Sequence, residues 1–440
     1  MSSRSMDVLA LAVYVLPLAL VIAVYVWRQN RTHARHLRTL QETIEAGMTE
    51  PASLHPIIDP SKCLGCGTCV KACPETSHHD VLGLINGKAA LIGPTDCIGH
   101  GACKTACPFD AITLVFGTER RGLDIPVLKP NFESNVPGIY VAGELGGMGL
   151  IKNALTQGQQ AVEAIAKANV KRPGALDVLI VGAGPAGLAA SLAAKKLGLS
   201  YLTVEQEALG GAVFQYPRGK LVMTAPVELP LIGKVQFRNT SKEELLKFWS
   251  QACNGNGLKI SYQERVESIE RKDGGFYVKT GKQQHIASAV LLGIGRRGTP
   301  RKLGVPGEDL AKVVYRLIDP DQYRGRQVIV VGGGDSALEA AASIAELGDT
   351  TVTLSYRGEA FQRAKQRNRQ RVDEASTKGR LKVLLNSQIR EIRPDKVILK
   401  QSGNELALRN DAVIVSAGGI LPNDFLKSIG IEVETKYGTV

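Results

Sequence analysis

The chain has 440 residues, of which 44% are hydrophobic and 22% charged, as expected for a globular protein of about two to four domains. Its formal net charge is +12, but only 5% of residues are aromatic and no basic stripe interleaves with them. This pattern argues against a nucleic-acid partner. Seven of the eight cysteines fall between Cys63 and Cys107, which is typical of a metal or cluster site in a reducing compartment and not of a disulfide framework.

An uncharged run begins the chain. Residues 8–27 carry no charge, and at about 1.5 Å per residue a helix of this length spans the ~30 Å core of a bilayer. Basic residues follow the run, which predicts an N-terminus outside and a C-terminus inside. We therefore expect a single-pass anchor in a bacterial inner membrane, with the catalytic domains on the cytoplasmic side. The basic residues are Arg28, Arg31, Arg35 and Arg38.

A first cysteine motif follows. Cys63, Cys66, Cys69 and Cys73 are separated by two, two and three residues, and Pro74 comes next. Thiolates at this spacing are typical of iron–sulfur clusters, and the cysteine before proline serves the other cluster of a pair. The rival metal, zinc, prefers separated cysteine pairs.

A second motif repeats the spacing with one change. Cys97, His100, Cys103 and Cys107 precede Pro108, so His100 stands where the second cysteine is expected. The two motifs together resemble the bacterial dicluster ferredoxin, over residues 55–118. This resemblance implies one cluster on Cys63, Cys66, Cys69 and Cys107, and another on Cys73, Cys97 and Cys103.

His100 leaves three interpretations open. Imidazole ligation would remove negative charge from the cluster and raise its reduction potential. Alternatively, the second cluster holds three irons and no ligand here, or this site is lost.

A dinucleotide fingerprint lies further along. An apolar strand leads into Gly182, Gly184 and Gly187, then an alanine-rich helix and a second strand that ends at Glu205, 18 residues past the last glycine. Such glycines admit a pyrophosphate at the helix N-terminus, and such an acid accepts a hydrogen bond from a ribose hydroxyl.

A second fingerprint starts at Gly332 and Gly334, with Ala337 as the permitted third position. No acid follows its second strand, and cations stand there instead, which favours the 2′-phosphate of NADP over NAD. The alternative is that the basic run 363–371 is only a solvated helix face. The candidate NAD(P) residues are Gly332, Gly334, Ser336, Arg357 and Arg363.

Two such units in one chain indicate one site for FAD and one for a nicotinamide nucleotide. Gly210-Gly211, the Leu303–Glu308 stretch and the Ser416–Gly419 stretch resemble the thioredoxin reductase superfamily, and Tyr216-Pro217 resembles its bacillithiol disulfide reductase branch. The resemblance covers nearly all of residues 119–440 and implies that Gly210 and Gly211 contact FAD.

The order of segments departs from that family. Its closing segment for the FAD site comes last, whereas here a matching piece, with Gly143, Glu144 and the helix start at Asn153, precedes the first fingerprint. The FAD lobe is therefore predicted to be circularly permuted. The predicted domains are a membrane anchor (1–28), a juxtamembrane linker (29–54), the ferredoxin domain (55–118), the FAD closing segment (119–170), the FAD lobe (171–304), the NAD(P) lobe (305–415) and a return to the FAD lobe (416–440).

Redox-active thiols of the family are missing. No CxxC occurs after Cys107, and Ala186 stands where the bacillithiol branch places a cysteine. The remaining thiol, Cys253, is expected to be packed and inert. Disulfide reduction is therefore a weak hypothesis.

The predicted fold class is α/β, with two Rossmann-like lobes, a small α+β dicluster ferredoxin domain and one transmembrane helix. The predicted function is electron transfer between NAD(P)H, FAD and two iron–sulfur clusters, to or from a quinone, a cytochrome or a ferredoxin-like protein. A membrane-bound redox sensor is the alternative. No catalytic acid or base can be named, and relatives of this fold suggest a homodimer by analogy only.

Overall fold

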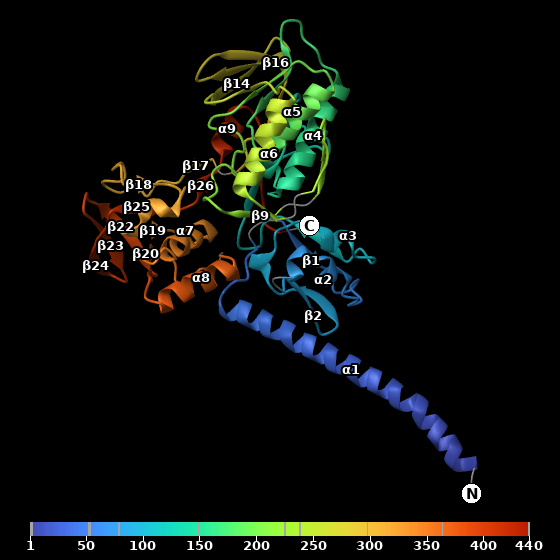
Figure 1. Ribbon diagram of the computed structural model, residues 1–440. Helices are drawn as coiled ribbons and strands as arrows, with labels where there is room; N and C mark the ends of the chain where they lie inside the picture. The colour runs from blue at the N-terminus through green and yellow to red at the C-terminus, as the bar shows by residue number, and fades with distance from the viewer. Residues whose placement is uncertain are drawn as a thin grey trace.

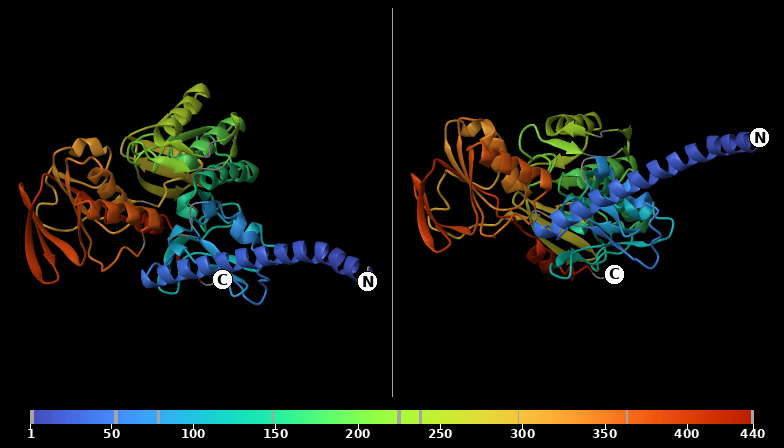
Figure 2. Two further views of the ribbon diagram at one scale, coloured as in Figure 1. Left: turned by 60° about the horizontal axis from the view of Figure 1, so that its bottom comes forward. Right: turned by 90° about the horizontal axis from the view of Figure 1, so that it is seen from below.

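The chain forms three units and one long N-terminal helix (Figure 1). The ferredoxin-type unit lies in the middle, with the two α/β units beside and above it, and the helix projects away from all three (Figures 1 and 2). The computed structural model describes residues 3–51, 54–77, 80–147, 149–223, 226–236, 239–296, 298–362 and 364–438.

Helix α1 (Ser3–Glu45) contacts the ferredoxin-type unit through its C-terminal half. The ring of His36 is buried, and its Nδ1 accepts a hydrogen bond from the Leu84 N–H at 3.1 Å. His33 Nδ1 donates to the Leu84 carbonyl at 3.2 Å. The N-terminal part of the helix extends away from the body of the molecule (Figure 2). The large apolar side chains from Val15 to Trp27 are exposed.

The predicted transmembrane helix is not supported. Within the described residues, no helix is long and apolar enough to cross a bilayer. The predicted span 8–27 includes residues 8–14, whose side chains lie outside what the structure describes.

The ferredoxin-type unit is small and has a two-fold internal pattern. In each half a cysteine loop leads into a short helix. The unit has two antiparallel strand pairs, of which one joins its first and last strands and the other is a hairpin in the middle of its sequence. The pairs are β1 (His55–Ile58) with β4 (Ile112–Val115) and β2 (Leu82–Ile85) with β3 (Lys88–Leu91), and the helices are α2 (Thr68–Ala72), α3 (Ala102–Thr105), η1 (Pro74–Ser77) and η2 (Pro94–Asp96).

A seven-stranded sheet forms the first α/β unit, in the order β13-β8-β7-β16-β15-β14 with β6 paired to β16. Strand β6 precedes the glycine-loop strand β7 in sequence, yet it joins the same sheet, parallel to β16. Helix α4, which follows β6, packs on α5 so closely that a Cβ at Gly158 would stand 2.0 Å from the Ala186 carbonyl oxygen. The elements are β6 (Ile139–Val141), η3 (Glu144–Gly146), α4 (Ile151–Ala168), β7 (Leu176–Val181), α5 (Pro185–Lys196), β8 (Tyr201–Val204), β13 (Ile260–Ser261), β14 (Val266–Lys272), β15 (Gly275–Thr280) and β16 (Gln284–Leu292).

Helix α6 and two small strand pairs cover one side of this unit. The helix starts with a capping box, in which Ser241 accepts from the Glu244 N–H and Glu244 accepts from the Ser241 N–H. Its buried face includes Trp249 and Cys253. The elements are β9 (Leu221–Met223), β10 (Val227–Leu229), β11 (Gly233–Val235), β12 (Asn239–Ser241) and α6 (Lys242–Gly255).

The second α/β unit has a five-stranded parallel sheet in the order β18-β25-β19-β20-β21 and a three-stranded antiparallel sheet β22-β23-β24. Alanines of α7 pack on the parallel sheet in a buried core. The elements are β18 (Val313–Val314), η4 (Pro320–Tyr323), β19 (Gln327–Val331), α7 (Asp335–Ala345), β20 (Thr351–Ser355), α8 (Gln366–Thr377), β21 (Leu381–Leu384), β22 (Ser387–Ile392), β23 (Lys396–Gln401), β24 (Asn404–Arg409) and β25 (Ala412–Val415).

The last segment returns to the first unit. Strand β26 pairs with β17, and β27 pairs antiparallel with β5, just after the ferredoxin-type unit. Asp124 in β5 ties this return together, because its carboxylate accepts from Asn423 Nδ2 and from Thr435 Oγ1, each at 2.7 Å. The elements are β5 (Leu123–Pro126), β17 (Thr299–Pro300), β26 (Gly419–Ile420), α9 (Asn423–Ser428) and β27 (Val433–Lys436).

Candidate cluster and dinucleotide sites

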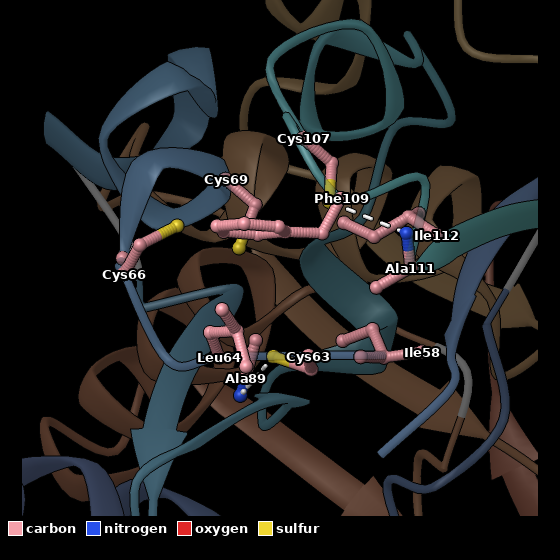
Figure 3. Close-up of a pocket in the computed structure, with 11 residues that line it drawn as sticks. Ile58, Cys63, Leu64, Cys66, Cys69, Ala89, Cys107, Phe109, Ala111 and Ile112 are labelled. Atoms are coloured by element: carbon pink, nitrogen blue, oxygen red, sulfur yellow. Dashed lines mark hydrogen bonds between the residues drawn. The ribbon is translucent and has the colours of Figure 1, made fainter. Parts of the chain in front are cut away.

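The fold gathers four cysteines around one hollow, which we call the outer hollow (Figure 3). Three come from the loop before and the first turn of α2, and the fourth comes from the end of the second motif. Backbone amides donate to the sulfurs, from Ala89 to Cys63 and from Ala111 to Cys107, each at 3.4 Å (Figure 3). The four cysteines are Cys63, Cys66, Cys69 and Cys107, the set that the resemblance to dicluster ferredoxins implies for one cluster.

A second hollow, the inner hollow, brings together the remaining cysteines of the motifs. Cys73, Cys97, His100 and Cys103 all line it. His100 therefore occupies the place of a fourth ligand beside three cysteines. The Ala102 N–H lies 3.4 Å from its Nδ1.

The chemistry of the lining suits an iron–sulfur cluster in each hollow. Four thiols line the outer hollow, and three thiols with one imidazole line the inner hollow. Cysteine thiolates are the usual protein ligands of iron–sulfur clusters, and histidine can take the place of cysteine.

Backbone geometry explains the glycines of the outer loop. Gly65 has a φ of +69°, and a Cβ there would stand 2.0 Å from the Gly87 carbonyl oxygen. Gly67 also has a positive φ, but a Cβ there would meet only Leu84 at 3.5 Å. Gly65 is therefore required both by its conformation and by the hairpin that it touches.

The thiols of Cys69 and Cys97 differ from that of Cys66. Burial raises the pKa of Cys69 and of Cys97 to about 11 each. Cys66, in contrast, is exposed, and its contact with Thr68 lowers the pKa of its thiol. If Cys69 and Cys97 hold a cluster, the positive charge of its iron would keep these buried groups as thiolates.

The surroundings of the two hollows differ in a way that matters for electron transfer. Next to the outer hollow, Leu64 and Phe109 are exposed, at 65% and 41% of their full surface. The inner hollow lies toward the first α/β unit: burial lowers the pKa of His100, and the charge of Lys152 in α4 lowers it further. Gly147, just ahead of α4, packs against the ring of Phe116, which follows β4.

The first glycine loop is built for close backbone approach. A Cβ at Gly187 would stand 1.7 Å from the Gly182 carbonyl oxygen, and one at Gly182 would stand 2.6 Å from the Gly293 oxygen. Gly184 faces Gly211, its nearest neighbour, so bare backbone is presented on both sides. This arrangement suits a pyrophosphate at the start of α5, and Gly210, at φ +111°, begins the facing turn.

Glu205 lies at the end of β8, as the fingerprint predicts, and is only 5% exposed. Its two oxygens accept from the N–H groups of Ala183 and Glu207, at 2.7 and 2.9 Å. Burial raises the pKa of this carboxyl. Because each carboxylate oxygen has a second lone pair, Glu205 keeps acceptor capacity for a ribose hydroxyl.

The predicted closing segment contacts this glycine loop. A Cβ at Gly143 would meet the Cβ atoms of Ala186 and Ala154, at 3.2 and 3.5 Å. Two residues here had not been predicted. Gln157 accepts from the Gly143 N–H at 2.8 Å, and Arg296, which is partly buried, interacts electrostatically with Glu144. Asn153 lies in the first turn of α4.

The second glycine loop is covered by an aromatic pair. A Cβ at Gly333 would stand 2.3 Å from the ring of Tyr356, which stacks on Phe361 with centroids 5.6 Å apart. Gly332 packs on the Ser416 carbonyl, Gly334 has no neighbour within 4 Å of a Cβ position among the described residues, and Ser336 lies in the first turn of α7. Arg357 is exposed and lies two residues after the end of β20, whereas Arg363 lies outside the described residues.

Cys253 is 6% exposed within a hydrophobic core, and burial raises the pKa of its thiol to about 11. Such a thiol is a poor nucleophile. The structure thus places it as a packing residue.

Comparisons with known proteins identify both parts of the chain. A family model for pyridine nucleotide-disulphide oxidoreductases matches residues 179–440, and one for the 4Fe-4S dicluster domain matches residues 55–108. The chain belongs to the pyridine nucleotide-disulphide oxidoreductase family. Within that family it is thioredoxin reductase-like, and it is an NAD(P)H-dependent flavin oxidoreductase with an N-terminal dicluster domain. The family implies FAD and NAD(P), and the dicluster domain implies two iron–sulfur clusters.

Two similar relatives of this oxidoreductase are named ferredoxin–NADP reductases. The one from Ignicoccus hospitalis is 31% identical over 59% of this chain and 83% of its own length. The one from Thermus thermophilus is 32% identical over 59% of this chain and 77% of its own length. Among solved structures, the bacillithiol disulfide reductase Bdr from Bacillus cereus matches 58% of this chain and 81% of its own, with a TM-score of 0.53 and 24% identity, which supports the fold alone.

Proposed function

We propose that this oxidoreductase transfers electrons between NAD(P)H and a redox partner by way of FAD, the inner hollow and then the outer hollow. When bound, FAD exchanges a hydride with a nicotinamide and single electrons with iron–sulfur clusters. The observation that carries the proposal is the position of the inner hollow. His100 interacts with Lys152 at the start of α4, and Phe116 packs on Gly147 in the predicted closing segment.

The permuted chain order supports this route. Strand β6 pairs with β16 and α4 packs on α5, although both precede β7 in sequence. In this proposal, residues 119–170 are the closing segment of the FAD lobe, moved ahead of the first fingerprint. The ferredoxin-type unit then leads directly into the segment with Gly143, Glu144 and Asn153 that borders the flavin. Residues 171–304 and 416–440 would complete the FAD lobe, and residues 305–415 would form the NAD(P) lobe.

The names of the relatives suggest the kind of partner. If their ferredoxin–NADP reductase activity extends to this chain, the fused dicluster domain takes the place of a separate ferredoxin. Electrons would then leave, or enter, at the outer hollow, where Cys66 and the apolar side chains of Leu64 and Phe109 are exposed. The external partner in this scheme is a one-electron carrier such as a quinone, a cytochrome or another iron–sulfur protein.

We further propose a preference for NADPH over NADH. The support is Arg357, an exposed cation two residues after the end of β20 and next to the position where an NAD site would carry an acid. Arg357→Ala should raise the Kd for NADP⁺ by about 10- to 150-fold and leave that for NAD⁺ unchanged, because one charge-assisted contact is worth about 1.5–3 kcal/mol. Arg390→Ala, an exposed arginine on β22, is the matched control. Equal affinity of the Arg357→Ala variant and the unaltered protein for NADP⁺ would refute this assignment.

Membrane attachment belongs to the same proposal. The apolar side chains from Val15 to Trp27 are exposed, and Arg28 and Arg31 follow them. Flotation of the full chain with vesicles of phosphatidylcholine and phosphatidylglycerol tests the idea. We expect the chain to float, and the variant Leu16→Glu/Leu20→Glu/Val24→Glu to stay at the bottom. Identical behaviour of the two proteins would refute attachment through this helix.

The route itself is tested by mixing the cluster-loaded chain with NADPH, and separately NADH, without oxygen. Absorbance follows the flavin and EPR follows the clusters. Flavin bleaching followed by a reduced-cluster signal supports the route. No bleaching with either nucleotide would refute it and favour the alternative of a redox sensor.

A further inference from the structure

Strand β27 joins two parts of the molecule that lie far apart in the sequence. It pairs with β5, and 311 residues separate Asp124 from its strand partner Thr435. Strand β5 belongs to the segment that leads from the ferredoxin-type unit to the first α/β unit. This segment starts at Phe116, directly after β4, and ends at Pro126, and we call residues 116–126 the connection. The pairing therefore holds the connection against a distant segment of the chain.

Close backbone contacts extend this pairing toward the ferredoxin-type unit. The Gly438 N–H donates to the Phe116 carbonyl at 2.8 Å. A Cβ at Gly117 would stand 2.1 Å from the Lys436 carbonyl oxygen, so no side chain fits between the connection and β27 at this point. On its other side, the ring of Phe116 packs on Gly147. The connection is thus in close contact with β27 and with the predicted closing segment of the FAD lobe.

Asp124 is the centre of the contacts made by the connection. Its two carboxylate oxygens accept from Asn423 Nδ2 of α9 and from Thr435 Oγ1 of β27, each at 2.7 Å. Its backbone carbonyl accepts from Arg296 Nη2 at 3.0 Å. Helix α9 packs on the sheet of the first α/β unit through buried Leu426. One residue of the connection therefore bonds to three separate segments that belong to, or pack on, this unit.

Arg296 extends the contact toward the predicted flavin site. It lies four residues after the end of β16, a central strand of the sheet of the first α/β unit. Burial lowers the pKa of Arg296, and the charges of Glu144 and Asp124 oppose this shift. The guanidinium that bonds to the connection is thus also influenced by the acid of the predicted closing segment.

The strand pair needs these side-chain contacts. It consists of four residue pairs, and an isolated pair of strands is only marginally stable in water. Because no short turn joins β5 to β27, bringing them together also costs more chain entropy than closing a hairpin. Hydrogen bonds to a charged carboxylate are stronger than those between neutral groups, so the Asp124 carboxylate contributes strongly to holding the two strands together.

We propose that Asp124 is a positioning residue, which holds the ferredoxin-type unit in a fixed place on the FAD lobe by joining the connection to α9, β27 and Arg296. This inference rests on the proposed function, because the placement matters for activity only if electrons pass between the inner hollow and the flavin. Asp124 lines neither hollow and lies outside both glycine loops, so it acts through the connection.

Hydrogen exchange of the full chain, loaded with FAD and clusters, tests the contact without turnover. In Asp124→Ala we expect peptides over 123–127 and over 432–438 to exchange about tenfold faster or more, because two hydrogen bonds to a charged acceptor are lost. Thr435→Val removes one of these two bonds and should have a smaller effect on the same peptides.

Asp411→Ala is the matched control. The Asp411 carboxylate accepts from the Gln327 N–H at 2.7 Å, within the NAD(P)-side unit and away from the connection. This variant also loses a hydrogen bond to a charged acceptor, but it should leave both peptides unchanged. If Asp124→Ala leaves both peptides as protected as in the unaltered chain, the contact does not hold the connection and the proposal is overturned.

Anaerobic mixing with NADPH gives a readout that general loss of structure would not reproduce. In Asp124→Ala the flavin should bleach at the rate of the unaltered chain, with the same FAD and iron contents. Reduction of the clusters after bleaching should slow about tenfold, because transfer depends on how the reacting groups are placed. Asp124→Asn keeps one acceptor oxygen and should restore part of the rate.

The outcomes separate this inference from the function on which it rests. If the clusters of the unaltered chain stay oxidised after the flavin bleaches, the proposed function fails, and the positioning role fails with it. If they are reduced in the unaltered chain and equally fast in Asp124→Ala, only the positioning role is overturned. If Asp124→Ala loses FAD or iron, Thr435→Val decides: slower cluster reduction supports the role, and an unchanged rate overturns it.

Discussion

The two hollows of the ferredoxin-type unit arise from one repeated motif but have different surroundings. The outer hollow is lined by four cysteines, one of them exposed, and is flanked by exposed Leu64 and Phe109. The inner hollow has His100 in place of one cysteine and lies toward Lys152 and the start of α4. The difference shows that two halves built on one repeated motif can differ in one lining residue and in the parts of the chain that surround them.

The largest expected effect is the selective loss of the outer site. Gly65→Ala places a methyl group 2.0 Å from the Gly87 oxygen, whereas Gly67→Ala meets only Leu84 at 3.5 Å. Both residues have a positive φ, which costs about 1–2 kcal/mol for alanine. We therefore expect Gly65→Ala to lose most of one cluster's iron and Gly67→Ala to retain it, measured by iron content and EPR. Equal iron content in the two variants would contradict the assigned packing.

The next effect concerns the inner site alone. His100→Cys should supply a fourth thiolate and lower the reduction potential of one cluster by about 100 mV or more, because thiolate adds negative charge. A redox titration followed by EPR measures both clusters at once. The potential of the outer cluster should stay within about 20 mV of its original value, since a distant charge is largely screened. If both potentials shift alike, or neither does, His100 does not face a cluster.

A smaller effect is expected from the charge on α4. Lys152→Gln removes a positive charge near the inner hollow and should lower that cluster's potential by tens of mV at most, because a partly solvated charge contributes only about 1 kcal/mol or less. Lys167→Gln, in the last turn of the same helix, is the control. If Lys152→Gln shifts the reduction potential of the outer cluster and not that of the inner cluster, the assignment of the inner and outer sites is reversed.

The smallest effect is confined to one hairpin that touches both hollows. Burial lowers the pKa of His36 below its usual 6.5, so the docked state of α1 resists the proton that the undocked state accepts. The stability from this contact is therefore complete well above pH 6.5 and decreases as the pH falls below it. We expect the Leu84 amide, which donates to His36, to lose protection several-fold between pH 7.5 and 5.5.

The Ile92 amide is the reference for that experiment. It donates to the Val81 carbonyl at 2.9 Å, within the same hairpin but without a histidine. After correction for intrinsic exchange, its protection should stay constant over the same pH range. A parallel loss at both amides would indicate general loosening of the hairpin and contradict a specific role of His36.

Local motifs made much of this molecule predictable. The resemblance of the two cysteine motifs to dicluster ferredoxins implied which side chains share each hollow. The glycine spacing predicted two strand–loop–helix units, because that pattern is set by short-range geometry. Contacts between units were not predictable in this way. Arg296, for example, gains its neighbour Glu144 only when segments far apart in the sequence fold together.

The N-terminal helix shows what hydropathy alone cannot predict. Its prediction rested on an uncharged run over residues 8–27, whereas the described part of the chain contains no helix that is long and apolar enough to cross a bilayer. Hydropathy alone does not say whether such a run crosses a bilayer or lies on its surface. The docking of the adjoining stretch through His33 and His36 is a tertiary contact that periodicity does not reveal.

The central claim is that the inner hollow adjoins the flavin and the outer hollow meets the partner. Rapid freeze-quench EPR of the cluster-loaded chain after mixing with NADPH tests it most directly, with the His100→Cys variant used to assign the signals. Our account predicts that the signal altered in His100→Cys appears first after flavin bleaching and the other signal follows. If the signal that His100→Cys leaves unchanged appears first, the proposed order of the two clusters is wrong. If the flavin bleaches and neither cluster is reduced, the proposed route from flavin to clusters is wrong.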